Sequence, residues 1–264
     1  MRVRDKVVVV TGAASGIGRA MAVRFAEEGA AGILVADLDE AGAAAVAERI
    51  GDRAKAVRAD VSVEDDVREI VDTAERSLGQ IALFCSNAGI ITGHGVEEAS
   101  DEEWSRTLAV NTLAHVYAAR AVLPAMVERG GGYLLNTCSA AGLVNCPGDA
   151  PYAVSKAAAI SFAEWVAIHY RARGIGVSVL CPQGVRTGMM REDLKDENLT
   201  ARAVISSGAV LEPEEVAGHV VEGLDAERFY ILPHPEVAGF FQMKAGDPDR
   251  WLSGMSRFVE SLAR

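Results

Sequence analysis

The N-terminal stretch of the chain constrains its fold most strongly, because it joins a buried strand, a glycine-rich turn and a helix. Val7–Val10 is a continuous β-branched run, the pattern of a strand covered on both faces of a parallel sheet. It leads into Gly12, Gly16 and Gly18, and a helix with apolar residues at helical spacing then continues to Gly29. Glycines let the backbone approach a pyrophosphate, and a helix N-terminus offers free N–H groups. The pattern predicts a phosphate-binding loop, although a glycine-rich turn that binds no ligand would have the same sequence pattern.

Short apolar runs and helical patterns alternate along the rest of the chain. We expect helices from Ile17 to Gly29, over Glu40–Arg49 and Val63–Leu78, from Ser100 to about Arg129, and from Pro151 to Gly174. We expect the strands to be Val7–Val10, Gly32–Ala36, Lys55–Arg58, Ile81–Cys85, Tyr133–Thr137, Ile175–Leu180 and Phe229–Leu232. This alternation predicts an α/β protein with a doubly wound, Rossmann-type parallel sheet and helices on both faces. No repeat or linker interrupts it, so we expect one domain over residues 1–264.

Polar or turn-forming residues stand where the predicted strands end. In a doubly wound sheet the ligand lies beyond the carboxyl ends of the strands. The residues found at these ends are Gly12, Asp37, Asp60, Asn87, Ser139 and Pro182. Asp37 also stands at the distance from Gly18 where an acidic residue that accepts hydrogen bonds from an adenosine ribose is expected. Their convergence predicts a dinucleotide site at this edge.

Tyr152 and Lys156 are four residues apart on a predicted helix, so they share one face. Pro151 suits the first turn of that helix, and Asp149 is a candidate cap. A lysine ammonium one turn away favours the phenolate and can bring a tyrosine pKa of about 10 towards neutrality. Such a tyrosine can exchange a proton with an alcohol or a ketone. Taken alone, the pair would also be compatible with an ordinary solvated helix face.

Over residues 5–232 the chain resembles the short-chain dehydrogenase/reductase family. The resemblance rests on seven motifs that occur in order on the expected elements. They are Thr11-Gly12-x-x-x-Gly16-x-Gly18, Asp60-Val61, Asn87-Ala88-Gly89, Asn111, Ser139, Tyr152-x-x-x-Lys156 and Pro182-x-x-Val185-x-Thr187. The resemblance implies that a nicotinamide dinucleotide binds in the crevice and that hydride is transferred at a carbonyl or carbinol carbon.

The resemblance also implies a role for each motif. Tyr152 would be the general acid/base, Ser139 would hold the substrate oxygen, and Lys156 would bind the nicotinamide ribose and lower the tyrosine pKa. Asn111 would hold a water in the proton relay. Cofactor contacts are expected from Gly12, Ser15, Gly16, Ile17, Gly18, Asp37, Leu38, Asp60, Val61, Asn87, Ala88, Gly89, Tyr152, Lys156, Pro182, Val185 and Thr187.

Two departures from the family pattern affect the substrate end. Gln183 follows the proline after the sixth strand, where the family commonly has glycine. Its side chain either faces solvent or reaches the substrate. The second departure is a C-terminal extension over residues 233–264 in place of a glycine-rich tail. It begins with His234 between two prolines, which we interpret as a turn residue rather than a ligand or base.

The C-terminal extension carries an apolar stripe at helical spacing, which must be covered. The stripe either packs on its own subunit or across a two-fold axis, and the resemblance implies a homodimer or homotetramer. Its residues are Trp251, Leu252, Met255, Phe258, Val259 and Leu262.

The cofactor is expected to be NAD(H) rather than NADP(H). Asp37 would accept hydrogen bonds from the ribose hydroxyls, and its charge would repel a 2′-phosphate. Leu38 and Ser15 stand where NADP-preferring relatives usually carry Arg or Lys. Arg19 lies beyond the last glycine of the motif and is not counted as a phosphate ligand.

The composition mainly excludes other classes of protein. The formal net charge of −11 and the absence of a basic stripe argue against nucleic-acid and anionic-membrane binding. The longest apolar runs fall far short of a membrane span, and no signal peptide is recognisable. The cysteines Cys85, Cys138, Cys146 and Cys181 have no metal-ligand spacing, and three of them accompany apolar strands. We expect a cytoplasmic protein without a metal.

The sequence favours an active oxidoreductase that interconverts a secondary alcohol and a ketone. The alternative is a catalytically silent NAD-binding sensor or scaffold, but such a relative would be expected to have lost Ser139, Tyr152 or Lys156. The substrate is expected to be mainly apolar, and its contacts are predicted from Ser139, Leu143, Val144, Gln183, Met189 and Met190. Residues 188–208 are expected to form a lid. Arg186 and Arg191 are the candidates for gripping an anionic group, should the substrate carry one.

Overall fold

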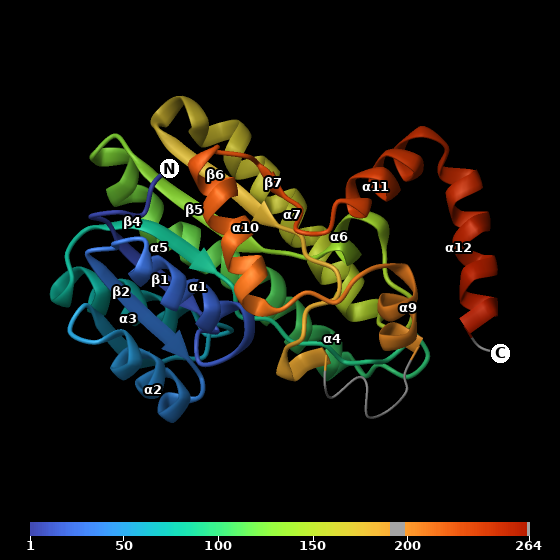
Figure 1. Cartoon of the computed structure of the whole chain (residues 1–264), viewed down its shortest axis with the longest axis horizontal. Helices are drawn as coiled ribbons and strands as arrows, with labels where there is room; N and C mark the ends of the chain where they lie inside the picture. Colours follow the sequence, from blue (N-terminus) through green and yellow to red (C-terminus); the bar gives the residue numbers. More distant parts are fainter. Residues whose placement is uncertain (191–198, 263–264) are drawn as a thin grey trace.

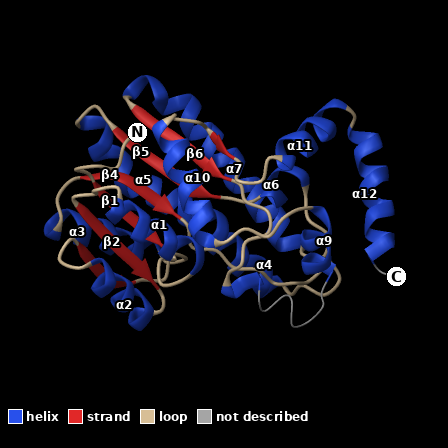
Figure 2. Cartoon of the chain, in the orientation of Figure 1, coloured by secondary structure: helices blue, strands red, loops and turns tan. Residues whose placement is uncertain are grey.

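The computed structural model describes residues 1–190 and 199–262, and these form a parallel sheet between two layers of helices (Figures 1 and 2). The seven strands follow the order β3-β2-β1-β4-β5-β6-β7. They are β1 (Val7–Thr11), β2 (Gly32–Asp37), β3 (Ala54–Arg58), β4 (Ile81–Ser86), β5 (Gly132–Thr137), β6 (Ile175–Leu180) and β7 (Tyr230–Ile231). The predicted Rossmann-type sheet is confirmed, and each strand lies within about two residues of its expected bounds.

Helices cover both faces of the sheet because the strands are apolar on both sides. One face is covered by α1 (Gly16–Glu27), α2 (Glu40–Ile50) and α10 (Pro213–Asp225). The other face is covered by α3 (Glu64–Ser77), α5 (Ala114–Glu128) and α7 (Ala150–Tyr170). Successive strand residues point to opposite layers, so Val7 and Val9 pack with one set of helices and Val8 and Val10 with the other. The continuous β-branched run therefore reflects burial on both sides.

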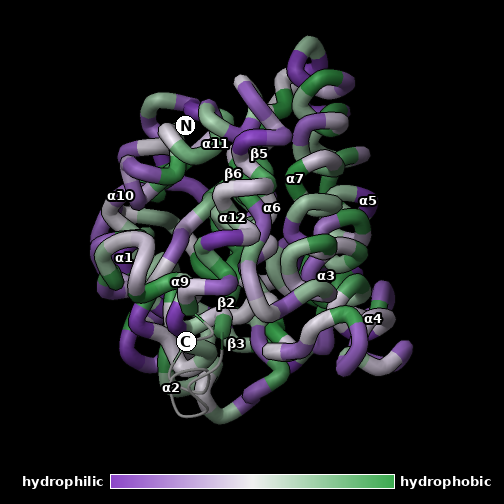
Figure 3. The backbone as a smooth tube through the Cα atoms, turned by 90° about the vertical axis from the view of Figure 1, so that its right-hand side faces the viewer, coloured by the Kyte–Doolittle hydropathy of each residue, from purple (hydrophilic) through white to green (hydrophobic). Residues whose placement is uncertain are grey.

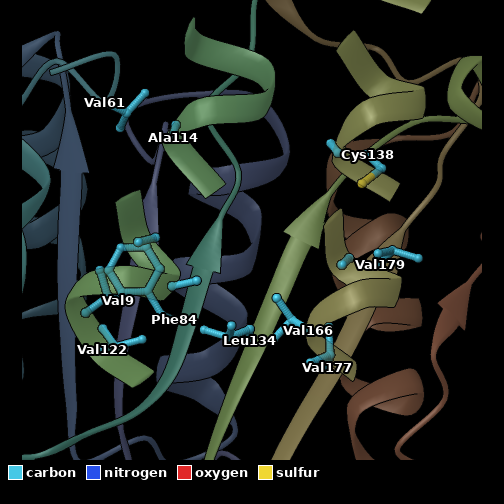
Figure 4. Packing of buried hydrophobic residues seen from close by; sticks show 14 of the residues in the cluster. Val9, Val61, Phe84, Ala114, Val122, Leu134, Cys138, Val166, Val177 and Val179 are labelled. Atoms are coloured by element: carbon cyan, nitrogen blue, oxygen red, sulfur yellow. The ribbon is translucent and has the colours of Figure 1, made fainter. Parts of the chain in front are cut away.

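The core between the sheet and the second helix layer is built from medium-sized side chains that interdigitate across the strands. Phe84 on β4 is fully buried, and Val9, Val122 and Leu134 belong to the same cluster (Figure 4). Fully burying a side chain of this kind contributes roughly 1.5–3 kcal/mol relative to exposure. The strand ends that carry the polar residues are thus held on a rigid frame.

The long helix expected from Ser100 to about Arg129 is interrupted. Ser100 and Glu103 form the predicted capping box at the start of α4 (Asp101–Leu108). A π-helical turn, Ala109–Leu113, then separates α4 from α5. This wider turn contains Asn111, and π-turns of this kind are frequent at functional sites.

The carboxyl ends of the strands point towards a group of additional helices. The arrowheads in Figure 2 lead to this side, where α12 is the outermost element in Figure 1. Viewed from that side, in Figure 3, α12 lies in front of α6 and β6. The helices on this side are α4, α6 (Ala140–Val144), α9 (Leu199–Ser207), α11 (Glu236–Gly246) and α12 (Pro248–Leu262). No helix among the described residues is long and apolar enough to cross a membrane.

Three of the four cysteines lie in the core. Cys85, Cys138 and Cys181 are buried, and burial raises the pKa of the Cys138 thiol to about 12. A thiol with so high a pKa stays protonated and behaves as a small apolar group. These residues therefore act through packing.

His115 is an unusual core residue, because it is 2% exposed and neither ring nitrogen has a hydrogen-bond partner among the described residues. Burial, followed by the positive charge of Lys156, lowers the pKa of His115 to about 3. The Asn111 backbone and the Asn136 side chain lie beside the ring outside hydrogen-bonding geometry and offset this only in part. The imidazole is therefore neutral in the folded protein at ordinary pH.

Replacing His115 with leucine should make stability less sensitive to acid. The unfolded imidazole takes up a proton below its ordinary pKa of 6.5, whereas the folded one stays neutral down to about pH 3. Stability therefore falls as the pH falls between these values. From about pH 7.5 to about pH 5.5 the native protein should lose about 1.4 kcal/mol more than His115→Leu. Urea unfolding at both pH values measures this, and His219→Gln at an exposed position should behave like the native protein. Equal losses in the native protein and His115→Leu would contradict the explanation.

Candidate active site

A cavity of about 920 Å³ runs along the carboxyl ends of the strands. Most of the predicted site residues line it, from Gly12 and Asp37 at one end to Ser139, Tyr152 and Met190 at the other. Three predicted residues do not. Gly18 packs behind the glycine loop, Asn111 is fully buried, and Leu143 is a core residue. Leu143 therefore lies in the core cluster and outside the cavity lining, and the structure does not bring it to the substrate end of the cavity.

The glycine loop lies close to the first turn of α1. Gly12 has a φ of +64°, which favours glycine. A Cβ at Gly18 would overlap the Gly12 carbonyl, so only glycine lets the helix begin this close to the loop. The Asp37 carboxylate accepts hydrogen bonds from Ala14 N (2.9 Å) and Asp39 N (3.0 Å). The backbone thus fixes this negative charge beside the loop.

Asn87 joins three strand ends. Its backbone N–H donates to Thr11 Oγ1 (2.9 Å), and its amide nitrogen donates to Thr11 O (3.0 Å). Its amide oxygen accepts from Thr137 Oγ1 (3.0 Å) on β5. The side chain therefore holds the ends of β1, β4 and β5 in register at the floor of the cavity.

Asp60 is paired with a residue that the sequence did not single out. Both terminal nitrogens of Arg106 lie 3.1 Å from Asp60 Oδ2, and Arg106 lines the cavity. Burial raises the pKa of Asp60, but hydrogen bonds from Ser62 and Arg106 outweigh it, so the net pKa is lowered. Asp60 is ionised and its orientation is fixed.

The catalytic candidates meet between β5 and α7. Tyr152, Ser139 and Lys156 all line the cavity, and the Lys156 ammonium lies 5.7 Å from the centre of the Tyr152 ring. Lys156 Nζ donates to Thr137 O (2.9 Å), which anchors it at the end of β5. Ser139 caps α6 and accepts from Ala141 N (3.1 Å).

The expected lowering of the Tyr152 pKa does not occur in the protein by itself. Burial raises the pKa of Tyr152 well above its ordinary value of 10, and a hydrogen bond with Ser139 opposes this only in part. Burial likewise lowers the pKa of Lys156. The sequence showed the spacing of the pair but could not show how much water surrounds it.

Asn111 holds backbone segments together. Its amide oxygen accepts from Ile90 N (2.9 Å), and its amide nitrogen donates to Ile90 O (2.9 Å) and Ser155 Oγ (3.0 Å). Ser155 Oγ in turn donates to Tyr152 O (2.8 Å). The side chain thus ties the loop after β4 to the helix that carries Tyr152.

The half of the cavity beyond Ser139 is mainly apolar. Val144 lines one side, Met189 and Met190 follow the end of β6, and Ala203 and Val204 project from α9. Residues 191–198, which include Arg191 and part of the expected lid, lie outside the described residues. The C-terminal extension also lines this half, through Val237, Phe240, Met243, Trp251, Met255 and Phe258. The stripe noted in the sequence therefore turns partly towards the cavity of its own subunit.

Gln183 lies at the base of this apolar half. Its amide nitrogen donates to Ser207 Oγ on α9, and its amide oxygen is buried without a partner among the described residues. The side chain therefore does not extend freely into solvent. Its backbone N–H donates to His234 Nδ1 (3.1 Å), and His234 Nε2 lies 3.1 Å from Gly184 O. His234 is a buried link between the loop after β6 and the C-terminal extension.

Comparison with known proteins decides the family. Residues 6–198 match the family described as short chain dehydrogenase. The chain belongs to the short-chain dehydrogenase/reductase family.

Several relatives of this dehydrogenase have defined activities or structures. It is 37% identical over 243 residues to 1-deoxy-11-beta-hydroxypentalenate dehydrogenase of Streptomyces exfoliatus, covering 89% of this chain and 86% of that protein. It is 37% identical over 186 residues to 3beta-hydroxysteroid dehydrogenase 2 of Eggerthella lenta, covering 69% of this chain and 71% of that protein. A family member from Burkholderia phymatum, solved in complex with NAD, superposes with a TM-score of 0.86 at 29% identity, covering 94% of this chain and 96% of that one.

The residues that the sequence missed in this dehydrogenase are distant in the chain from its motifs. Arg106 carries no motif of its own, and the cavity-lining residues of α11, Val237, Phe240 and Met243, have an ordinary helical spacing that does not point to a ligand. Only α12 gave a signal, the apolar spacing of Trp251, Met255 and Phe258. No cluster of His, Cys, Asp or Glu suited to a metal ion occurs in the part of the chain that the structure describes.

Asp149 positions the start of α7, the helix that carries Tyr152 and Lys156. It is 2% exposed, and its carboxylate accepts from Thr92 N (2.7 Å), Gly93 N (2.8 Å), Thr92 Oγ1 (2.9 Å) and Tyr152 N (2.9 Å). The predicted cap is thus confirmed, and it also fixes the loop that follows Gly89.

Asp149→Asn should destabilise the fold, because an amide nitrogen cannot accept hydrogen bonds: one orientation leaves Thr92 N and Gly93 N without a partner, and the other leaves Tyr152 N without one. The expected loss is about 2–4 kcal/mol in the free energy of unfolding. Asp39→Asn is the matched control, since Asp39 caps α2 through one exposed hydrogen bond and asparagine caps equally well. Denaturant unfolding of both variants measures the difference. Equal, small effects would show that Asp149 is an ordinary cap.

Proposed function

We propose that this short-chain dehydrogenase interconverts a secondary alcohol and a ketone in a mainly apolar compound, with NAD(H) as cofactor and Tyr152 as general acid/base. The observation that carries the proposal is that Ser139, Tyr152 and Lys156 line the same cavity at the start of its apolar half, with the Lys156 ammonium 5.7 Å from the centre of the Tyr152 ring. Two hydroxyl groups there can bind one substrate oxygen.

The residues at the other end of the cavity suit a dinucleotide. The loop from Gly12 to Gly16 leads into the N-terminus of α1, which offers free N–H groups to a pyrophosphate. The fixed Asp37 carboxylate can accept hydrogen bonds from ribose hydroxyls, and the family member from Burkholderia phymatum was solved with NAD. NAD(H), when bound, would accept or supply the hydride.

The protein's own residues account for the proton. Burial keeps Tyr152 protonated at neutral pH, so its hydroxyl can donate to a carbonyl oxygen that Ser139 also holds. In the direction of alcohol oxidation the phenolate must form, and the Lys156 ammonium stabilises that charge. Thr137 O and the Asn111 network keep Lys156 and the Tyr152 helix in place.

The apolar character of the substrate is supported by the lining of the cavity and by the relatives. Met189, Met190 and Val144 lie near the catalytic pair, and methionine adapts to varied apolar surfaces. Arg186 forms an ion pair with Glu212 (2.6 Å), so its charge is already engaged. The two relatives described above are named for a hydroxypentalenate and a hydroxysteroid.

We also propose that the protein is a homodimer or homotetramer that associates through α7. Val154, Trp165 and Ile168 on this helix are 49%, 52% and 76% exposed, which leaves an apolar face open to a second copy. The small side chains of residues 157–159 permit the close approach of a partner helix. Analytical ultracentrifugation of the purified protein distinguishes these assemblies from a monomer.

Tyr152→Phe should abolish most turnover while leaving cofactor binding intact. The ring still packs, but no proton can be exchanged with the substrate oxygen, so kcat should fall by roughly two to four orders of magnitude. The absorbance of the reduced nicotinamide gives the rate, and fluorescence titration gives the cofactor affinity. Tyr170→Phe, on the same helix but outside the cavity lining, should retain native turnover. A Tyr152→Phe enzyme with near-native turnover would overturn the mechanism.

Asp37 should make the enzyme prefer NAD over NADP. At an effective dielectric constant of about 20, the Asp37 carboxylate repels each unit of negative charge on a 2′-phosphate about 4 Å away by roughly 4 kcal/mol before screening. We expect a preference of about a hundredfold or more in kcat/KM, and a clearly smaller one in Asp37→Ala. Asp39→Ser, which removes an exposed charge but keeps a cap for α2, should change the preference much less. Equal or better use of NADP by the native enzyme would refute the assignment.

A further inference from the structure

The C-terminal helix α12 presents an apolar face to the cavity. Trp251, Met255 and Phe258 follow each other at helical spacing and all line the cavity, and Leu262 continues the same face. Ser253, Arg257 and Glu260 on the rest of the helix are exposed. Leu252, the neighbour of Trp251, is 62% exposed and lies outside the cavity lining. The apolar face of α12 is therefore turned towards the cavity, whereas the apolar face of an ordinary surface helix packs against the sheet.

The wall that α11 and α12 form is fixed to the base of the site. Lys244 Nζ on α11 donates to Leu143 O (2.6 Å) on α6, the helix that begins next to Ser139. Val237 is fully buried in the core, and His234 bonds the loop after β6 just before α11 starts. These contacts hold the wall at a set position relative to the catalytic hydroxyl groups.

The wall is long and uncharged. From Trp251 to Phe258 a helix rises about 10 Å. Trp251 and Phe258 bring aromatic rings, and Phe240 on α11 lies 6.2 Å from Trp251 between ring centres. None of the described lining residues on α9, α11 and α12 is charged. Val144 and the helix α9 also line this half of the cavity.

We infer that this wall selects a rigid, multi-ring alcohol or ketone, whose oxygen lies at Ser139 and Tyr152 and whose far ring packs against Trp251 and Phe258. The inference rests on the proposed function and narrows its substrate class. A broad rigid ligand covers an aromatic wall about 10 Å long without losing the internal rotations that a flexible chain would lose. A small cyclic alcohol reaches the catalytic pair but leaves the wall uncovered.

The test compares kcat/KM, with NAD, for cyclohexanol, the two-ring decalol, a four-ring 3-hydroxysteroid and 2-dodecanol. The native enzyme should favour the alcohols with more rings. Trp251→Ala and Phe258→Ala should lower kcat/KM about 10- to 100-fold for the steroid and less than about threefold for cyclohexanol. Met255→Trp, which fills the cavity without removing packing, should block the steroid selectively. Leu252→Ala, on the same helix outside the lining, should change neither.

The outcomes separate this inference from the proposed function. Turnover of cyclohexanol with no gain for the multi-ring alcohols, or equal losses for small and large alcohols in the variants, would overturn the inference and leave the function standing. Preference for 2-dodecanol would replace the multi-ring class with a flexible chain and also overturn it. Failure of the native enzyme to oxidise any of the four alcohols, or to reduce the matching ketones, would overturn both. Thermal unfolding of each variant shows whether the fold is retained, and Met255→Trp tests the wall even if Trp251→Ala does not fold.

Discussion

A parallel sheet joins each strand to the next only through a crossover, and this constraint organises the whole protein. Because every strand of the described sheet runs the same way, all of its carboxyl ends meet at one edge. The loops that leave this edge bring together residues as distant in the chain as Gly12 and Thr187. The site is thus a consequence of strand direction, and the helices on both faces make the edge rigid.

Polar side chains at this edge stabilise one another before they can meet any ligand. Asn87 joins three strand ends, Asn111 joins the loop after β4 to α7, and Asp149 bonds four donors at the start of that helix. Buried polar groups are costly unless they are hydrogen-bonded, so these networks permit little movement. Tyr152 and Lys156 are therefore held in place by hydrogen bonds to the helix and to the strand end beside them.

Burial sets the chemistry of the catalytic pair as much as proximity does. The pKa of Tyr152 is raised and that of Lys156 is lowered, because both side chains have lost water. A protonated tyrosine and a weakly hydrated lysine respond strongly to any further charge placed beside them. The apolar wall of α11 and α12 continues the lining of the cavity outward from Ser139.

The sequence by itself determined the parallel sheet, the glycine loop, the acidic residue at the end of β2 and the shared face of Tyr152 and Lys156. Each of these features depends on the periodicity or spacing of residues within one segment, and both can be seen in the amino-acid sequence. Only the tertiary structure decided that Leu143 faces the core, that Arg106 meets Asp60, that a π-turn interrupts the helix at Asn111 and that α12 turns Trp251 towards the cavity. These findings depend on contacts between segments that are distant in the chain and on how far each side chain is shielded from water. The local spacing of residues predicts neither property.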